Sequence, residues 1–165
     1  MNEHVILVNP KDEPIGSMDK LEVHQKGLLH RAFSVFVFND AGQLLLQRRA
    51  SDKYHSANLW TNTCCSHPYP EEYTLDAAKR RLKEEMGIDI DLEKKFEFIY
   101  RAELDNGLIE HEFDYVYTGL YNGQPHLNPA EASEYKWIGI GDLKTEIKVH
   151  PELFTEWLKI AIDSF

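Results

Sequence analysis

The sequence predicts one α/β (α+β) domain over residues 1–165, in which helices sandwich a mixed β-sheet. Three observations predict this class. The length of 165 residues lies within the roughly 100–200 residues of a single domain. A composition of 42% hydrophobic and 12% aromatic residues supplies enough apolar surface for one core. Strand-like and helix-like segments are interspersed, with hairpins among the strands, which favours a mixed sheet over a purely parallel one.

The N-terminal part of the chain predicts a strand, a short helix and a hairpin. Residues 5–8 form a short apolar run that ends at an Asn-Pro pair. Ser17 is placed to cap a helix over residues 18–26, and Gly27 follows as its C-terminal glycine. Two β-rich segments flank an Asn-Asp-Ala-Gly turn and predict a hairpin. These segments are 32–38 and 43–47.

The central part predicts a short strand, an amphipathic helix and a second hairpin. The strand is expected at 59–64. Thr74 occupies an N-cap position, apolar residues then recur at helical spacing as far as Met86, and Gly87 stands where a C-terminal glycine belongs. An Asp-Asn-Gly turn follows, which is a strong hairpin signal between two strand-like runs. These runs are 96–103 and 108–118.

The C-terminal part predicts a last strand and a last helix. The strand is expected at 135–140, and Pro151 is placed to open the helix. Six residues of this helix share one apolar stripe that would pack on the sheet. They are Phe154, Trp157, Leu158, Ala161, Ile162 and Phe165.

The charge and the cysteines limit the kinds of partner and compartment. The chain has 18 Lys and Arg against 28 Asp and Glu, a formal charge of −10, which argues against nucleic acids and anionic membranes as partners. The first residues lack the features of a secretory signal, and no apolar run approaches the roughly 18–20 residues of a membrane span. Cys64 and Cys65 are adjacent and suit a structural disulfide poorly. A cytoplasmic location is therefore expected.

A group of carboxylates and histidines has the composition of a metal site. Strand alternation puts Glu110, Glu112 and Asp114 on one face. Imidazoles from three of the eight histidines, together with two of these carboxylates, would favour a six-coordinate divalent metal over a tetrahedral structural zinc. These histidines are His24, His30 and His67. The alternative is that the carboxylates form the wet face of a half-buried sheet and that each histidine is an ordinary polar residue.

Basic residues occur at several places that could form a local pocket for an anion. Arg81 and Glu85 share a face of the central helix and could serve a phosphate and a hard cation. Lys53 follows Arg48-Arg49 after the first hairpin, and Lys20 lies in the first helix. The alternative is that Arg80 with Glu84, and Arg81 with Glu85, are i,i+4 ion pairs on a solvated face.

The segment from Ser66 to Ile88 resembles the Nudix box. In that motif a glycine is followed after five residues by Glu and after seven more by Arg-Glu, an aliphatic residue, any residue, Glu-Glu, any residue, Gly and an aliphatic residue. The matching residues are Glu72, Arg80, Leu82, Glu84, Glu85, Gly87 and Ile88. Ser66 replaces the opening glycine. Arg81 replaces one of the glutamates on which Nudix hydrolases usually rely to hold magnesium.

These departures resemble one branch of the superfamily, the type I isopentenyl-diphosphate isomerases. The resemblance covers nearly the whole chain. Its motifs are His30-Arg-Ala-Phe-Ser34, Leu45-Leu46-Gln47-Arg48-Arg49, Leu59-Trp-Thr-Asn62, Cys65-Ser66-His67-Pro68, Tyr100-Arg101-Ala102, Glu110-His111-Glu112 and Phe154-Thr-Glu-Trp157. The resemblance implies a Nudix-like fold and the isomerisation of isopentenyl diphosphate to dimethylallyl diphosphate, by proton addition and removal through a carbocation.

The resemblance also implies a role for each matching residue. Cys65 and Glu112 match the catalytic pair, and Tyr100 the tyrosine that supports the glutamate. Ligands of one tightly bound divalent metal (Mn²⁺, Zn²⁺ or Mg²⁺) are matched by His24, His30, His67, Glu110 and Glu112. Glu85 matches the contact of a second Mg²⁺ that enters with the substrate diphosphate. Substrate-binding residues are matched by Lys20, Arg49, Lys53, Arg81 and Trp157. The interval between His24 and His30 is one residue shorter than the family's usual interval.

Two other functions remain open at this stage. A Nudix diphosphohydrolase acting on a nucleoside or related diphosphate is suggested by the retained Glu72, Glu84 and Glu85. A non-enzymatic domain, in which a metal bound by His and Glu only stabilises the fold, is the third reading. The oligomeric state is not readable from the sequence.

Overall fold

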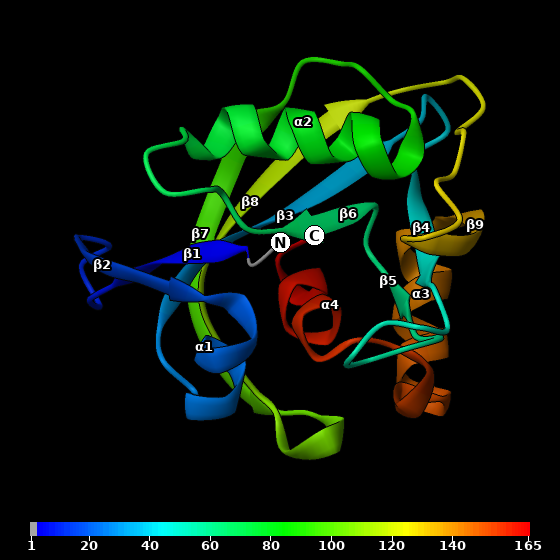
Figure 1. Ribbon diagram of the computed structural model, residues 1–165. Helices are drawn as coiled ribbons and strands as arrows, with labels where there is room; N and C mark the ends of the chain where they lie inside the picture. Colours follow the sequence, from blue (N-terminus) through cyan, green and yellow to red (C-terminus); the bar gives the residue numbers. More distant parts are fainter. Residues whose placement is uncertain (1–2) are drawn as a thin grey trace.

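The computed structural model describes residues 3–165 and contains a nine-stranded sheet with helices on both sides (Figure 1). The strands are β1 (His4–Val8), β2 (Pro14–Asp19), β3 (His30–Phe38), β4 (Gln43–Arg49), β5 (Trp60–Thr61), β6 (Cys64–Ser66), β7 (Glu93–Glu103), β8 (Ile109–Leu120) and β9 (Ala132–Gly139). The α-helices are α1 (Lys20–Lys26), α2 (Thr74–Met86), α3 (Ile140–Val149) and α4 (Glu156–Ala161), and short 3₁₀ turns lie at Asp105–Gly107, Pro151–Leu153 and Ile162–Ser164. The expected α+β class with a mixed sheet is confirmed.

Strand β3 is the centre of the sheet. It runs parallel to β8 from His30↔Glu112 to Phe38↔Leu120, and it pairs antiparallel with β6. β3 and β4 pair only at Phe38↔Leu44, so the predicted hairpin is closed at its turn and its strands then diverge. β4 instead pairs along its length with β9. The second predicted hairpin, β7–β8, is paired from Glu93↔Thr118 to Glu103↔Ile109.

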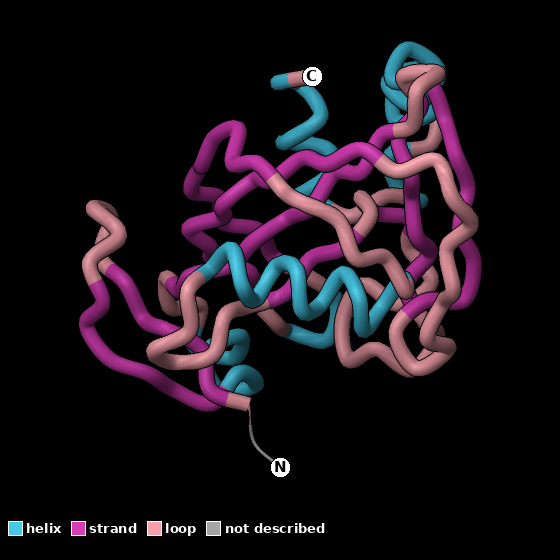
Figure 2. Tube along the Cα trace, turned by 90° about the horizontal axis from the view of Figure 1, so that it is seen from above, coloured by secondary structure: helices cyan, strands magenta, loops and turns pink. Residues whose placement is uncertain are grey.

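Helices cover the two faces of the sheet with separate apolar clusters. On one face, Ala78, Leu82 and Met86 of α2 pack on Phe33 and Val35 of β3. On the other face, residues of α3 and α4 pack on the opposite sides of β3, β4 and β8, and they include Leu143, Leu158, Phe36, Leu46 and Val116. Figure 2 shows α2 crossing the strands, while the β1–β2 hairpin extends from one side of the sheet. No helix within residues 3–165 is long and apolar enough to cross a membrane.

Alternation along β3 and β8 decides which residues face the site. The even-numbered residues of β3 and β8, among them Phe36 and Val116, face α3 and α4, and the odd-numbered ones, among them Phe33 and Tyr117, face α2. His30 and Glu112 are therefore on the face of α3 and α4, beyond the end of the apolar cluster.

Three boundary predictions were wrong at the helices. Residues 17 and 18 belong to β2, because Ile6↔Ser17 and Val5↔Met18 pair with β1; the cap of α1 is Asp19, whose carboxylate accepts the Glu22 amide at 3.2 Å. Tyr73, not Thr74, is the N-cap residue of α2. The predicted C-terminal helix is interrupted at Phe154, which pairs with Trp60 in an isolated bridge.

Two other segments also differ from the sequence prediction. The strand expected at 59–64 is split into β5 and β6, because the Asn62 amide donates to the carbonyls of Val35 at 3.1 Å and Cys64 at 2.9 Å and turns the chain from β4 to β3. Helix α3 was not predicted, and the last strand ends at Gly139, one residue before the predicted end.

Candidate active site

One cavity collects most of the predicted site residues. Its lining combines basic, acidic, histidine and aromatic side chains with one thiol. The lining residues are Glu3, Lys20, Phe33, Arg49, Lys53, Tyr54, His55, Cys65, Ser66, His67, Arg81, Glu85, Glu110, Glu112, Glu131 and Trp157. Every predicted catalytic, substrate-binding and metal residue is in this list except Tyr100, His24 and His30, which lie buried beside it.

Strand register places the reactive residues in two neighbouring rows. His30, Glu112 and Tyr100 are direct partners across β3, β8 and β7. Ser34 and Cys65 are partners across β3 and β6. Directly paired residues project from the same face of a sheet, so Cys65 shares its face with Glu112. Its neighbour Cys64 projects from the opposite face into the core beneath α2.

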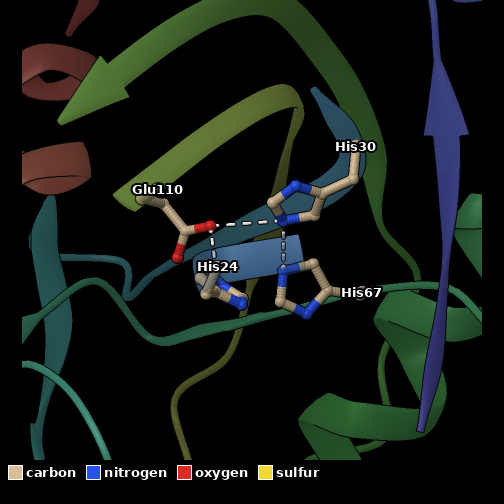
Figure 3. A group of neighbouring side chains, drawn as sticks. All are labelled: His24, His30, His67 and Glu110. Atoms are coloured by element: carbon tan, nitrogen blue, oxygen red, sulfur yellow. Dashed lines mark hydrogen bonds and ion pairs between the residues drawn. The ribbon is translucent and has the colours of Figure 1, made fainter. Parts of the chain in front are cut away.

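Three histidines and one carboxylate form a compact group that could hold a metal ion. His24, His30, His67 and Glu110 each offer one ligand atom, and these atoms lie within 4.8 Å of one another (Figure 3). His24 Nε2 is 2.8 Å and His30 Nε2 is 3.2 Å from Glu110 Oε1. The Nε2 atoms of His30 and His67 are 3.2 Å apart. His24 lies inside this group despite its short interval to His30.

The donor set and its surroundings fit a divalent metal. His24 Nδ1 lies 2.7 Å from the Lys20 carbonyl, and His30 Nδ1 lies 2.9 Å from the Leu28 carbonyl. Carbonyls only accept, so each Nδ1 carries a proton and each Nε2 atom points into the group, which is the orientation of metal-bound histidines. His24 Nε2 and Glu110 Oε1 are buried, and among the described residues their polar neighbours belong to this same group. A cation between them would satisfy both atoms.

The charges of the metal-free group are strongly coupled. Burial lowers the pKa of His30, but its hydrogen bonds to Glu110 and Glu112 and their negative charges outweigh burial and raise that pKa to about 10. Burial lowers the pKa of His67 to about 3, against the effect of its hydrogen bond to Glu112. Burial raises the pKa of Glu110, but His24 and His30 bring it well below the usual range. A proton on His30 therefore balances carboxylates that a metal ion would otherwise neutralise.

Glu112 is held from two sides at the edge of this group. The Tyr100 hydroxyl donates to Glu112 Oε1 at 2.5 Å, and His67 Nε2 lies 2.9 Å from Glu112 Oε2. His30 Nε2 lies 3.5 Å from the same oxygen, so Glu112 is in reach of a metal held by the histidines. Tyr100 is buried behind Glu112 and does not line the cavity. Burial raises the pKa of the Cys65 thiol well above its usual range, so this side chain is in its protonated form.

The predicted basic residues do gather, but carboxylates of the same cavity pair with three of them. Lys20 Nζ lies 2.9 Å from Glu3 Oε2. Lys53 forms an ion pair with Glu131, and Arg81 lies 3.2 Å from the same Glu131 oxygen. Arg49 has no ion pair within residues 3–165, and its guanidinium lies 5.5 Å from the centre of the Trp157 ring.

Glu85 lies at the end of the cavity beneath α2 and is almost fully buried. Arg81 Nη2 lies 3.0 Å from Glu85 Oε2, and the Cys64 thiol donates to the same oxygen at 3.4 Å. The Gln47 amide donates to Glu85 Oε1 at 3.1 Å. Burial raises the pKa of Glu85, against the opposing charge of Arg81. The two other retained Nudix-box carboxylates, Glu72 and Glu84, lie outside the cavity lining.

Several residues of the site were missed from the sequence. His55 is buried with its Nε2 3.6 Å from Glu110 Oε2, and its ring stands edge-on to Trp157 with centroids 6.0 Å apart. Glu131 pairs with two of the basic residues. Both residues lie outside strands and helices, where no periodicity marks a side chain that points inward. Asp114 is fully buried and accepts from the Ser34 hydroxyl at 2.8 Å; strand alternation had placed it on the correct face.

Comparisons with known proteins agree with this geometry. Residues 28–158 match the family model described as the NUDIX domain. The chain is 50% identical over 163 residues to the isopentenyl-diphosphate Delta-isomerase 2 of Aromatoleum aromaticum, covering 99% of this chain and 86% of that protein. It is 53% identical over 157 residues to the isopentenyl-diphosphate Delta-isomerase of Serratia proteamaculans, covering 95% of this chain and 88% of that protein.

Solved structures show the same fold at lower identity. A protein from Deinococcus radiodurans superposes with a TM-score of 0.83 at 21% identity, covering 98% of both chains. A MutT NUDIX hydrolase from Burkholderia pseudomallei gives a TM-score of 0.65 at 22% identity, covering 82% of this chain and 96% of that one.

Proposed function

The chain belongs to the NUDIX domain family and, within it, to the isopentenyl-diphosphate Delta-isomerases, and on this premise we propose the roles of its active-site residues. It isomerises isopentenyl diphosphate to dimethylallyl diphosphate. The reaction adds a proton to the terminal carbon of the alkene, which leaves a tertiary carbocation, and removes a proton from the carbon on the diphosphate side. No atom other than hydrogen changes its place.

Cys65 and Glu112 are the groups that exchange these protons. An unactivated alkene needs one group that gives a proton and another that takes one, in a site that excludes water from the cation. Cys65 supplies a thiol that burial keeps protonated, and Glu112 supplies a carboxyl group at the same cavity. Tyr100 is a positioning residue, because its hydroxyl holds Glu112 Oε1 and fixes the orientation of the carboxyl group.

His24, His30, His67, Glu110 and Glu112 would hold one divalent metal, for which Mn²⁺, Zn²⁺ and Mg²⁺ all accept such ligands to some degree. When bound, this ion fixes the orientation of Glu112 and alters its affinity for a proton. Glu85 would contact a second ion, Mg²⁺, that accompanies the diphosphate. The support for this assignment is the compact, buried set of nitrogen and oxygen donors, whose ligand atoms lie within 4.8 Å of one another.

The diphosphate is anchored by Lys20, Arg49, Lys53 and Arg81. All four line the cavity, and this anchoring leaves the small hydrocarbon to be positioned by shape. Trp157 lies at the same cavity, is 3% exposed and can stabilise the carbocation through its π face by roughly 0.5–2 kcal/mol. Its place on the buried stripe of α4 also makes it part of the core.

The single observation that carries these assignments is that Cys65 and Glu112 line one cavity beside the histidine group. The test is incubation of metal-loaded protein with isopentenyl diphosphate and Mg²⁺ in deuterated water. Dimethylallyl diphosphate carrying deuterium is expected from the native protein and none from a Cys65→Ala variant. An active Cys65→Ala variant would remove the thiol from the proton-transfer pair.

The hydrolase alternative has weaker support in the site. Of the retained Nudix-box carboxylates, Glu72 accepts from Nε and Nη2 of Arg80 at 2.9 Å each, and Glu84 lies 2.6 Å from Arg81. These ion pairs tie the loop before α2 to the helix and leave Glu85 as the only box carboxylate at the cavity among the described residues. Assay of phosphate release from nucleoside diphosphates tests this directly, and none is expected.

A further inference from the structure

We propose that Glu131 is a specificity-determining residue that makes diphosphate binding depend on an accompanying divalent cation. This inference rests on the proposed function of Lys53 and Arg81 as diphosphate-binding residues. The carboxylate of Glu131 forms ion pairs with both of these side chains. A diphosphate that binds them therefore displaces Glu131. The displaced carboxylate stays close to the bound diphosphate and repels it, and Mg²⁺ on the diphosphate offsets this repulsion.

The contacts of Glu131 place it between the cations. Its Oε2 atom pairs with Lys53 Nζ and lies 3.2 Å from Arg81 Nη2. The same Arg81 nitrogen lies 3.0 Å from Glu85 Oε2. One guanidinium nitrogen therefore bridges two carboxylates at the end of the cavity where the diphosphate is expected. Replacement of Glu131 by a phosphate oxygen keeps the charge-assisted bonds of both cations.

The backbone around Glu131 is fixed, so the exchange needs only the side chain to move. The Glu131 amide donates to the Asn128 carbonyl at 2.9 Å, and the Glu131 carbonyl accepts the Ala50 amide at 3.0 Å. The Asn128 amide donates to the Glu85 carbonyl at 2.9 Å. These bonds tie the segment before β9 to the ends of β4 and α2. The Glu131 side chain is 20% exposed and can turn towards solvent by a change of rotamer.

The charge balance of the cavity makes this exchange costly for a metal-free anion. Four cationic side chains line the cavity, and they are Lys20, Arg49, Lys53 and Arg81. Five carboxylates line it as well, and they are Glu3, Glu85, Glu110, Glu112 and Glu131. Glu110 and Glu112 belong to the metal group, so Glu3, Glu85 and Glu131 are the carboxylates left near the four cations. A diphosphate adds several negative charges, and like charges close together in a partly buried site repel one another strongly. A divalent cation bound to the diphosphate offsets part of this repulsion.

Glu131 differs from the other carboxylates near these cations. Among residues 3–165, Glu3 forms an ion pair with Lys20 and with no other residue, and it is half-exposed, whereas Glu85 is buried on α2. Within the described part of the chain, only Glu131 pairs with both Lys53 and Arg81. Glu134, three residues later, pairs with Arg48 at 2.7 Å outside the cavity lining, which makes it a matched control.

The test is calorimetric titration of inorganic pyrophosphate into the protein with its resident metal, with and without added Mg²⁺. In the native protein, added Mg²⁺ is expected to strengthen binding markedly. In Glu131→Gln, binding without added Mg²⁺ is expected to tighten about tenfold, so that the ratio of the two dissociation constants falls, since a like charge has been removed from the site. Glu134→Gln is expected to keep the native ratio, as is Glu131→Asp, which retains the charge.

Two results with Glu131→Gln would overturn the proposal. An unchanged or weaker affinity of Glu131→Gln for pyrophosphate without Mg²⁺ contradicts the displacement of Glu131. Loss of binding only in the presence of Mg²⁺ would make Glu131 a ligand of the cation instead. The Arg81→Ala variant separates the role of Glu131 from the proposed function of the basic residues. If this variant binds Mg²⁺-pyrophosphate like the native protein, the basic residues do not anchor the diphosphate, and both proposals fail. If it loses binding while Glu131→Gln keeps the native ratio, only the role of Glu131 fails.

Discussion

The two ends of the cavity are built from different kinds of side chain. At the metal end, His24, His30 and Glu110 are nearly or fully buried, and short side chains on β3, α1 and β8 bring their ligand atoms together. At the diphosphate end, the long side chains of Lys53 and Arg81 share Glu131 and reach in from a loop and from α2. In the proposed mechanism, the proton-transfer groups lie on paired strands, and the groups that anchor the diphosphate lie at the ends of long side chains.

This difference predicts which part of the site determines the turnover rate and which determines the affinity for the substrate. Strand register fixes His30, Glu112 and Tyr100 relative to one another with little freedom, as a proton transfer requires. In the proposed mechanism, Lys53 and Arg81 hold the diphosphate, which carries no reacting atom. Changes at the metal end should therefore reduce turnover, and changes at the diphosphate end should raise KM.

The largest expected effect is that of Glu112→Gln. The amide keeps the shape of the side chain but cannot act as a base, so kcat is expected to fall by about 10²–10⁴-fold with KM nearly unchanged. Steady-state kinetics on metal-loaded protein measures this. Glu103→Gln, at an exposed position of the same hairpin, is the matched control and should behave like the native protein. A KM increase as large as the loss in kcat would contradict the separation of the two ends.

Metal removal should affect the metal end alone. A chelator leaves His24, His30 and Glu110 without the cation that their geometry fits. At a metal concentration about 100 times the dissociation constant, the lost stabilisation is about 2.7 kcal/mol, or a fall of roughly 5–10 °C in the unfolding midpoint. Calorimetric scans with and without chelator measure it. An unchanged midpoint would show that the group does not hold a metal in solution.

Arg81→Ala should break the diphosphate end. Loss of a charged hydrogen-bond donor is expected to raise KM about tenfold to a hundredfold and to leave kcat within a few-fold. The comparison is with Arg48→Ala, since Arg48 pairs with Glu134 and does not line the cavity. If Arg81→Ala lowered kcat as much as Glu112→Gln does, the argument from side-chain placement would be wrong.

Tyr100→Phe is expected to have the smallest effect, and it tests whether the Tyr100 hydroxyl positions Glu112. It removes only the hydroxyl that holds Glu112 Oε1. A fall in kcat of about tenfold is expected, with unchanged metal content and KM. Metal analysis beside the kinetics is the decisive readout, because loss of the metal would assign Tyr100 to the stability of the histidine group.

Regular pairing made part of the fold predictable. The Asp105–Gly107 turn predicted β7 and β8, and alternation on β8 placed Glu110, Glu112 and Asp114 on one face, as observed. Helix α3 was not predicted from the sequence, because Leu143 is its only buried residue and Gly141 lowers its helix propensity. Ser17 resembled a cap, but pairing with Ile6 holds it in β2.

The site was predictable to the extent that residue types recur in a known family pattern. The resemblance supplied the roles of Cys65, Tyr100 and the basic residues, and the structure places them in or beside one cavity. His55 and Glu131 could not be inferred, because each reaches the cavity from irregular backbone whose course depends on tertiary hydrogen bonds. One of these bonds joins Ala50 to Glu131. The spacing of residues along the sequence does not reveal such tertiary hydrogen bonds.

The most direct test of the central claim is a crystal structure of the metal-loaded protein with an unreactive analogue of isopentenyl diphosphate. The account predicts Cys65 and Glu112 on opposite sides of the hydrocarbon, with Glu112 on the metal held by the three histidines and the diphosphate on Lys53 and Arg81. A hydrocarbon that lies away from Cys65, or has both groups on the same side, would contradict it.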